Sequence, residues 1–600
     1  MASKKNYPAI NYTARDFNSI KRELVDYAKR YYPNTFQDFN EAGFGALMLD
    51  TVSYVGDILS FYTDYNANES FLDTSIEYEN ILKHGRQLGY RFRGGGSSTG
   101  TATFYIIIPA NTSGTGPDTS YIPVLKRGSS VSSDNGALFV LNEDVVFSGV
   151  DNDIVVARVN TETGVPTHFA IRAFGQVISG QLREEIITVG GFEKFKTIEL
   201  DQEDIVEILS IQDSDGRAYF EVDYLSQDVI FRSVTNRDSS TNDRVPSLLK
   251  PIVVPRRFTS RRERTKTLLQ FGAGSERDVT ADPLIDPATT VLDFYSRDFV
   301  KQTSFDPANL LGTDKMGISP ANTELRVVYR VNTSGDVNVS ANGLNSIDVA
   351  TFSFDDINTL DVKKVSDVRN SLEVSNEEPI LGDVTLPTSK ELKIRIGDTF
   401  STQNRAVTAL DYKSLVYQMP SQFGAVKRVN VYRDANSVKR NLNLYVISED
   451  SEGNLVASNS VIKNNIKTWL NQSRMINDTI DIIDAKIVNV GIEFVVVGNL
   501  ESNRSQVLTN AIQSVASLVA QKSEIGEPFF ITDIYNVLNS TPGVVDTSSV
   551  KVVQKSGGNY STTTFDLTKA TSPDGRFINV PDNVIMEVKF PNDDIRGSVK

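Results

Sequence analysis

The hydrophobic pattern of the chain changes abruptly near residue 91, and this change sets the broad plan of the fold. Up to residue 90, apolar residues recur at spacings of three and four, the period of an amphipathic helix. Residues 94–100 are small and polar, and beyond them short β-branched and aromatic runs alternate with Gly, Asn, Asp and Pro. From about residue 402, strand-like runs alternate with helical ones. The pattern predicts a multidomain α+β protein with an N-terminal helical bundle, β-rich middle domains and C-terminal α+β sandwich domains.

The chain has 600 residues, enough for about four domains at roughly 150 residues each. The sequence predicts a helical docking domain, a linker, a β-rich middle region of one or two domains, an α+β self-association region and a C-terminal extension. In that order they span residues 1–93, 94–100, 101–400, 401–555 and 556–600. Within the middle region, strands are predicted at 101–108, 137–140, 154–159, 325–331 and 392–396, and an irregular excursion at 275–320.

The first and third helices of the N-terminal region carry start and stop signals. Thr13 and Asp16 resemble a capping box ahead of the first helix, which should end before Pro33. Thr74 and Glu77 resemble another capping box, ahead of a helix at residues 75–88 that Gly89 should end.

The second helix should begin near Gly43 and carries two apolar seams. A helix that is apolar on two sides must be covered on two sides, and the first helix can cover only one of them. Either helices of a partner protein cover the remaining seam, or the third helix folds back over it. The first seam comprises Phe44, Met48, Thr51, Val55, Ile58, Tyr62 and Tyr65, and the second comprises Leu47, Tyr54 and Phe61.

Composition excludes several classes of function. The chain contains no cysteine, so it has no disulfide, no thiolate metal site and no cysteine nucleophile. Its net charge of −15 argues against a dedicated nucleic-acid-binding protein. No apolar run approaches the roughly 18 residues of a membrane helix and no secretory signal is visible, so a cytosolic origin and no membrane partner are expected.

One local cluster of positive charge stands out against the acidic background. It is interpreted as a solvated loop, as a docking surface for an acidic protein or, least of all, as a nucleic-acid contact. This possible basic interface comprises Arg256, Arg257, Arg261, Arg262, Arg264 and Lys266.

The sequence offers no credible catalytic or metal-binding set. His84 and His168, the two histidines, have no partner at a metal-ligand spacing. Residues 96–100 match G-x-S-x-G, but in a linker rather than between a strand and a helix. Residues 213–216 resemble a calcium loop without its terminal oxygen donors and are better explained as a hairpin turn. We therefore expect no enzymatic activity, no metal and no cofactor.

An ordered set of short motifs resembles the baseplate J-like family and, within it, the wedge subunits of contractile-tailed phages. The N-terminal motifs are residues 40–43, the helix through Asp50 and Asp57, residues 69–74 and residues 88–90. Residues 271–274 and 325–331 resemble the family's glycine turn and β-strand. Residues 406–412, 419–420 and 424–426 resemble its entry into the last α+β domains.

The resemblance implies a structural role in a phage tail baseplate, in the virion, after assembly in the host bacterial cytoplasm. Similar proteins form a ring that joins wedges around the central hub, with two copies per wedge, and help couple baseplate rearrangement to sheath contraction. The implied partners are other copies of the chain, another wedge protein and the sheath-initiating protein. The resemblance, with a continuous apolar strand near residues 492–497, places self-association in the C-terminal α+β region. The alternatives are another structural component of a virion or contractile injection machine, or a carboxylate-based glycan-degrading tail enzyme.

Overall fold

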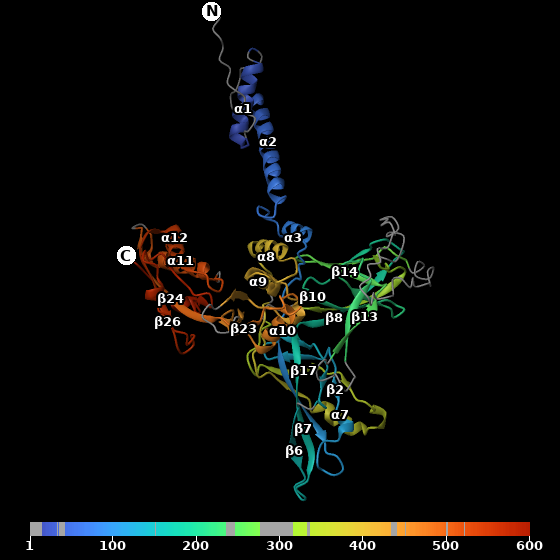
Figure 1. Ribbon diagram of the computed structural model, residues 1–600. Helices are drawn as coiled ribbons and strands as arrows, with labels where there is room; N and C mark the ends of the chain where they lie inside the picture. Colours follow the sequence, from blue (N-terminus) through green and yellow to red (C-terminus); the bar gives the residue numbers. More distant parts are fainter. Residues whose placement is uncertain are drawn as a thin grey trace, which may run out of the picture. The chain divides into compact units, whose positions relative to one another are not determined.

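The computed structural model describes most of the chain, in two compact units (Figure 1). The described residues are 15–32, 34, 43–149, 152–235, 247–275, 316–332, 337–383, 385–433, 441–450, 452–499, 502–520 and 523–600. Thr13, Pro33, residues 40–42 and most of the predicted excursion at 275–320 therefore lie outside them. One unit comprises Met1–Arg91 and Pro387–Phe400, and the other comprises Phe92–Leu386 and Ser401–Lys600. The predicted class, a multidomain α+β protein, is confirmed.

The N-terminal unit begins with two helices, α1 (Phe17–Tyr31) and α2 (Phe44–Glu69). Asp16 is the N-cap residue of α1, and its carboxylate accepts a hydrogen bond from the backbone N–H of Ser19 at 3.0 Å. The sequence instead predicts that Asp16 is the acidic residue of a capping box that begins at Thr13. The predicted start of the second helix is confirmed, because Gly43 is the N-cap of α2.

The third helix, α3 (Tyr78–Gln87), is shorter than predicted. Thr74 does not cap it, because its hydroxyl donates to the carbonyl of Asn68 at 2.6 Å. The connection is held instead by Glu69, whose carboxylate accepts from the backbone N–H of Ile76 at 2.6 Å and from the side chain of Asn80 at 2.9 Å. The predicted stop is confirmed, since Gly89 follows the helix with a φ of 88°.

A fourth helix of this unit, α8 (Ser389–Thr402), comes from far along the sequence. The predicted strand at 392–396 is wrong: Leu392 and Ile396 are both fully buried, four residues apart on one face of α8. A Cβ at Gly85 of α3 would lie 2.8 Å from Cδ1 of Ile396, so glycine lets these helices approach closely. Lys393 also donates to the carbonyl of Asp73 at 2.8 Å.

Because hydrogen bonds to its charged form lower the pKa of Glu69, the turn between α2 and α3 should be acid-sensitive. A lowered pKa means that the stabilisation is present above the ordinary glutamate value and is lost as the pH falls through the lowered value. Hydrogen exchange of residues 70–77 should be slower in the wild type than in Glu69→Gln at neutral pH, and the two should converge only as the pH falls through the lowered pKa of Glu69. Glu162→Gln, which lies in the other unit, is the control. Equal protection of wild type and Glu69→Gln at neutral pH would contradict the assignment.

The second unit contains two seven-stranded sheets. The first sheet runs in the order β17-β3-β4-β7-β1-β19, with β6 also paired to β7, and covers the largest apolar core. The second runs in the order β8-β16-β10-β11-β14-β15-β9 around a separate core. The first comprises β17 (Leu344–Val349), β3 (Ser130–Ser133), β4 (Leu138–Leu141), β7 (Pro166–Ser179), β1 (Thr99–Pro109), β19 (Glu373–Ser375) and β6 (Asp153–Val159). The second comprises β8 (Gln181–Val189), β16 (Thr323–Val331), β10 (Ile205–Gln212), β11 (Ala218–Glu221), β14 (Arg257–Arg262), β15 (Thr267–Phe271) and β9 (Thr197–Leu200).

Smaller elements accompany these sheets. They are the three-stranded sheet of β18 (Phe352–Ser353), β2 (Val124–Leu125) and β5 (Val145–Val146), the pair β12 (Val229–Thr235) and β13 (Ser247–Val253), and helix α7 (Val362–Asn370). The predicted hairpin turn at residues 213–216 is confirmed, because β10 and β11 pair antiparallel on either side of it.

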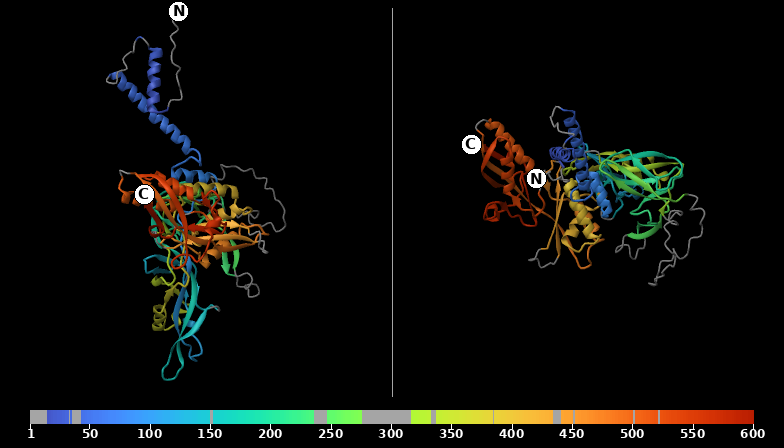
Figure 2. Two further views of the ribbon diagram at one scale, coloured as in Figure 1. Left: turned by 90° about the vertical axis from the view of Figure 1, so that its left-hand side faces the viewer. Right: turned by 90° about the horizontal axis from the view of Figure 1, so that it is seen from above.

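Two α+β modules follow, and both appear in orange to red in Figures 1 and 2. In each module helices accompany a four-stranded sheet, and the second module also contains the short helices α13 (Leu567–Ala570) and α14 (Pro591–Asp594). The first combines β20 (Arg428–Tyr432), β21 (Leu442–Glu449), β22 (Leu455–Val456) and β23 (Ile480–Asp484) with α9 (Ala409–Tyr417) and α10 (Ser460–Leu470). The second combines β24 (Lys486–Gly498), β26 (Val544–Lys555), β28 (Val584–Glu587) and β29 (Ile595–Val599) with α11 (Arg504–Val519) and α12 (Ile531–Ser540). Residues 556–600 therefore contribute two strands to the last sheet.

Residues 94–100 are built into the second unit, although their composition predicted a linker. Ser97 and Ser98 are fully buried, and the hydroxyl of Ser98 donates to Oδ1 of Asn338 at 2.7 Å. A Cβ at Gly96 would lie 2.0 Å from the carbonyl oxygen of Asp383, so the glycine serves close packing of two backbones. Small residues in this segment therefore reflect tight packing.

Candidate interaction surfaces

Helix α1 packs against a stripe of small residues on α2. Ala46 and Ser53 are buried there, and a Cβ at Gly56 would lie 3.3 Å from Cδ1 of Ile20. Lys21 of α1 forms an ion pair with Asp50 of α2 at 2.6 Å, and Arg15, just before α1, forms one with Asp64 at 2.9 Å. Small side chains let the two helix backbones approach closely, so α1 occupies this stripe rather than either apolar seam.

Both predicted seams of α2 consequently remain largely uncovered. Leu47, Tyr54 and Phe61 are 61%, 59% and 64% exposed. In the other seam, Ile58 and Tyr65 are half-buried, and the rest, Phe44, Met48, Thr51, Val55 and Tyr62, are exposed. The expectation that α1 covers one seam is therefore wrong. Among the described residues, α3 does not close the bundle over α2 either.

The start of α2 forms one side of an apolar hollow of about 310 Å³. Leu24 of α1 and Phe44, Met48 and Val52 of α2 are among its lining residues. Such a hollow suits an apolar side chain of a partner helix, in the manner of a knob entering a hole.

By length and composition alone, the 26-residue helix α2 could also cross a membrane. However, Asp50, Asp57 and Asp64 recur along it at seven-residue spacing. Asp50 forms an ion pair with Lys21 of α1, and Asp64 forms one with Arg15, just before α1. Placing a carboxylate near the bilayer centre raises the free energy of membrane insertion by about 2.5–3.5 kcal/mol. The pattern therefore favours a helix that packs against other protein helices.

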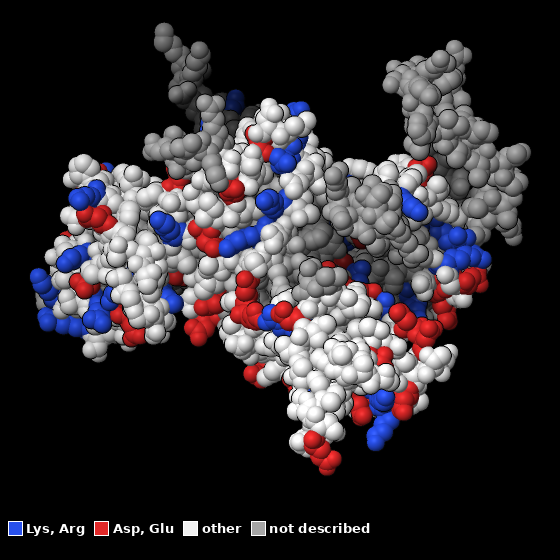
Figure 3. All heavy atoms as spheres, turned by 60° about the horizontal axis from the view of Figure 1, so that its bottom comes forward, with Lys and Arg blue, Asp and Glu red and all other residues white. Residues whose placement is uncertain are grey.

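The six residues of the possible basic interface do not present one continuous positive surface. Arg257 is buried and donates to the carbonyls of Leu225 and Val254 at 2.6 and 2.9 Å. Arg261 pairs with Glu263 at 2.8 Å, and Lys266 with Glu199 at 2.6 Å. Of the others, Arg256 and Arg262 are half-buried and Arg264 is exposed. Figure 3 likewise shows basic and acidic side chains interspersed over the face that it displays.

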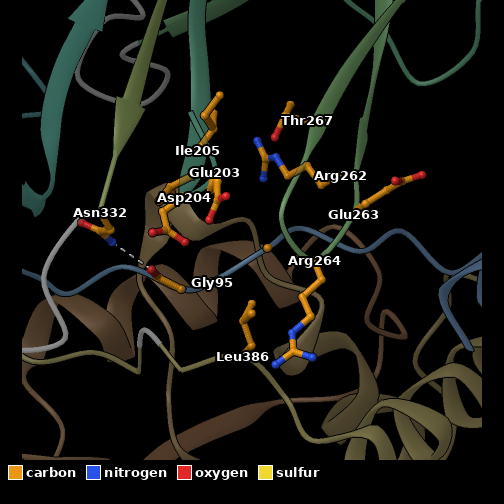
Figure 4. Close-up of a pocket in the computed structure, with 13 residues that line it drawn as sticks. Gly95, Glu203, Asp204, Ile205, Arg262, Glu263, Arg264, Thr267, Asn332 and Leu386 are labelled. Carbon is orange, nitrogen blue, oxygen red and sulfur yellow. Dashed lines mark hydrogen bonds between the residues drawn. The ribbon is translucent and has the colours of Figure 1, made fainter. Parts of the chain in front are cut away.

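Two of these arginines, Arg262 and Arg264, line a small pocket of about 60 Å³ (Figure 4). Arg262 donates to the carbonyl of Arg93, and its Nε has no hydrogen-bond partner among the described residues. Burial lowers the pKa of Arg262, while the carboxylates of Glu221 and Glu207 act against this shift. Glu203 and Asp204 also line the pocket, so its charge is mixed and it suits water better than an anion.

The histidines show no arrangement for catalysis. His84 lies 2.8 Å from the carbonyl oxygen of Glu69, and His168 lies 3.1 Å from the hydroxyl of Thr167. In the part of the chain that the structure describes, no group of three His, Asp or Glu side chains could hold a metal ion.

The N-terminal helices also correspond to a known sequence family. A sequence model of a family, the N-terminal domain of a bacteriophage baseplate protein, matches residues 16–87, which contain α1, α2 and α3. This match supports a structural component of a tail baseplate that works with other baseplate proteins.

A solved structure can also be aligned over almost the whole chain. It is the cryo-EM structure of the anti-feeding prophage (AFP) baseplate, 6-fold symmetrised, with 9% sequence identity over 96% of this chain and 99% of that chain. The TM-score of 0.27 is too low to establish a shared fold, so the family match alone supports the baseplate role. No curated protein matches the chain.

Proposed function

We propose that the protein is a wedge subunit of a contractile-tail baseplate, and that α1 and α2 dock it to helices of a neighbouring wedge protein. The observation that carries this proposal is the exposed double seam of α2, within the residues that match the baseplate N-terminal domain. Each large apolar side chain of the seams contributes about 1.5–3 kcal/mol when it is buried. A contiguous apolar patch of this kind marks an interaction site.

The proposal extends to the role of the chain in the assembled baseplate. Copies of the subunit join wedges into a ring around the hub, contact the sheath-initiating protein and help couple baseplate rearrangement to sheath contraction. This part rests on the motif resemblance together with the family match over residues 16–87. The protein is proposed to act by binding, without catalysis or a cofactor.

Co-expression of the full chain with the neighbouring wedge protein tests the docking role. We expect a stable complex and, in electron micrographs of the wedge mixture, closed rings. A fragment of residues 1–93 is a poor reagent, because it lacks α8, against which Gly85 of α3 packs. Flotation with liposomes in the absence of the partner would instead identify α2 as a membrane helix and contradict the proposal.

Self-association is proposed for the C-terminal α+β region. The strand β24 was expected to need burial on both faces, but between residues 492 and 497 only one face is fully buried. Ile492, Phe494 and Val496 pack beneath α11 and α12. On the opposite face Val497 is 37% exposed, and Val545 of the paired strand β26 is 66% exposed.

We expect Val545→Lys to weaken self-association of the full chain in sedimentation velocity by at least about tenfold, because it places a charge where an apolar contact is needed. Ile186→Lys, on β8 and 64% exposed, is a matched control. An unchanged sedimentation profile for Val545→Lys would show that self-association does not use this face.

A further inference from the structure

The strand β6 is an edge strand of the first seven-stranded sheet. It pairs with residues 166–172 of β7, on the side of β7 away from β1, and β7 is its one partner among the described strands. The β6–β7 hairpin lies at the bottom of Figure 1. All seven residues of β6 are exposed, and Ile154, Val155 and Val156 follow one another in its centre.

The exposed apolar residues of β6 continue the face of a buried core. Ile154 lies opposite Ile171, which is fully buried, and Val156 lies opposite Phe169, which is 7% exposed. Ile154 and Val156 themselves are 48% and 50% exposed. Exposed edge strands are ordinarily protected from pairing by charged side chains, Pro or β-bulges. In β6 such features lie toward the ends of the strand, as Asp153, Arg158 and a bulge at Ala157, and its centre carries none.

The other face of β6 carries a charge at each end. Val155 lies opposite Ala170 and Asp153 opposite Arg172, on the face that points away from the core. A bulge at Ala157 shifts the register, so that Arg158 lies opposite His168 and joins this same face. Asp153, Val155 and Arg158 therefore occupy successive positions on one side of the strand.

We propose that β6 pairs antiparallel with β6 of a second copy of this chain, about a two-fold axis through Val155. A two-fold axis perpendicular to the sheet keeps each side chain on its own face, so Val155 meets its equivalent and Ile154 meets Val156 of the other copy. Asp153 of each copy then lies across from Arg158 of the other. The strand is thus complementary to itself in its apolar contacts. Asp153, which pairs with Arg172 of its own chain at 2.5 Å, adds a charge opposite in sign to that of Arg158.

This contact goes beyond the proposed baseplate function and does not depend on it. It is a second self-contact, separate from the one proposed for the C-terminal region.

The absence of cysteine from the chain makes a direct test possible, because any disulfide must come from residues that are introduced. In the full chain, Val155→Cys should form a covalent dimer under mild oxidation at least about tenfold faster than Ile186→Cys, since directly opposed residues lie within disulfide range. A mixture of Ile154→Cys and Val156→Cys chains should cross-link more than either chain alone, which tests the register.

A charge placed at the two-fold axis tests the same contact without cross-linking. In a chain that already carries Val545→Lys, Val155→Lys should weaken the remaining self-association in sedimentation velocity by at least about tenfold. It should leave the melting temperature unchanged, because the side chain is 60% exposed. Val155→Thr, which keeps the β-branch, should retain this association. Equal cross-linking of Val155→Cys and Ile186→Cys, or association of the Val545→Lys chain that tolerates Val155→Lys, would overturn the proposal. Neither result would affect the docking of α2, which is measured separately with the wedge partner.

Discussion

Replacing Leu47, Tyr54 and Phe61 together with glutamate is expected to abolish co-purification of this chain with the neighbouring wedge protein. The three side chains form one seam of α2, and in the free protein they are 59–64% exposed. Each would contribute about 1.5–3 kcal/mol on burial, so their joint loss should weaken binding by more than about a hundredfold. The affinity of purified full-length chains, measured by calorimetry, checks this expectation.

The free variant should melt at the wild-type temperature and be more soluble, because the substitutions remove exposed apolar surface without touching the α1 contact. Ile186→Glu is the matched control, since it removes an equally exposed apolar side chain from β8. Wild-type affinity in the triple variant would show that α2 is not the docking element. A large drop in its melting temperature would show that the seam is covered within the chain.

Arg330→Ala should be among the most destabilising single substitutions in the second unit. The side chain of Arg330 is 1% exposed, and its guanidinium donates to the hydroxyl of Ser97 at 2.9 Å and to the carbonyl of Ser179, and pairs with Glu207 at 3.2 Å. Burial lowers its pKa and Glu207 opposes this shift. Truncation leaves the Glu207 carboxylate and two further acceptors without a partner, at a cost of about 3–5 kcal/mol.

Arg326→Ala, on the same strand β16, is the control. Arg326 also forms an ion pair, with Glu184 at 2.6 Å, but its side chain is 59% exposed, so its loss should have little effect in denaturant titrations. The double variant Arg330→Met with Glu207→Leu should recover much of the lost stability, because no charge is then left unpaired. Similar unfolding midpoints for Arg330→Ala and Arg326→Ala would contradict this account.

Periodicity in the sequence located the N-terminal helices well, because their apolar residues and caps act locally. Gly43 and Gly89 marked the start of α2 and the end of α3. The strand predicted at residues 392–396 failed, because Leu392 and Ile396 fit a helical spacing that five residues could not distinguish from a strand. Helix α8 packs against α3 although about 300 residues separate them in the sequence. A local sequence pattern cannot predict such a contact.

The apolar seams of α2 could likewise be found from spacing, but the way α1 packs against it could not. The contact depends on small residues, Ala46, Ser53 and Gly56, which give no hydrophobic signal. The prediction of a linker at residues 94–100 failed for the same reason. A run of Gly and Ser is typical of a flexible linker and also of backbones in close contact, and only neighbours such as Asp383 distinguish the two.

The position of α8 in the sequence also sets the order of events during synthesis. The N-terminal unit lacks the helix that packs against α3 until residues 387–400 have been made, roughly 300 residues after Arg91. At about 5–20 residues per second this interval lasts about 15–60 s. Throughout it the apolar surface of α3 that α8 later covers is open on the ribosome-bound chain. The first unit to emerge is therefore still incomplete when every strand of the two seven-stranded sheets has been made.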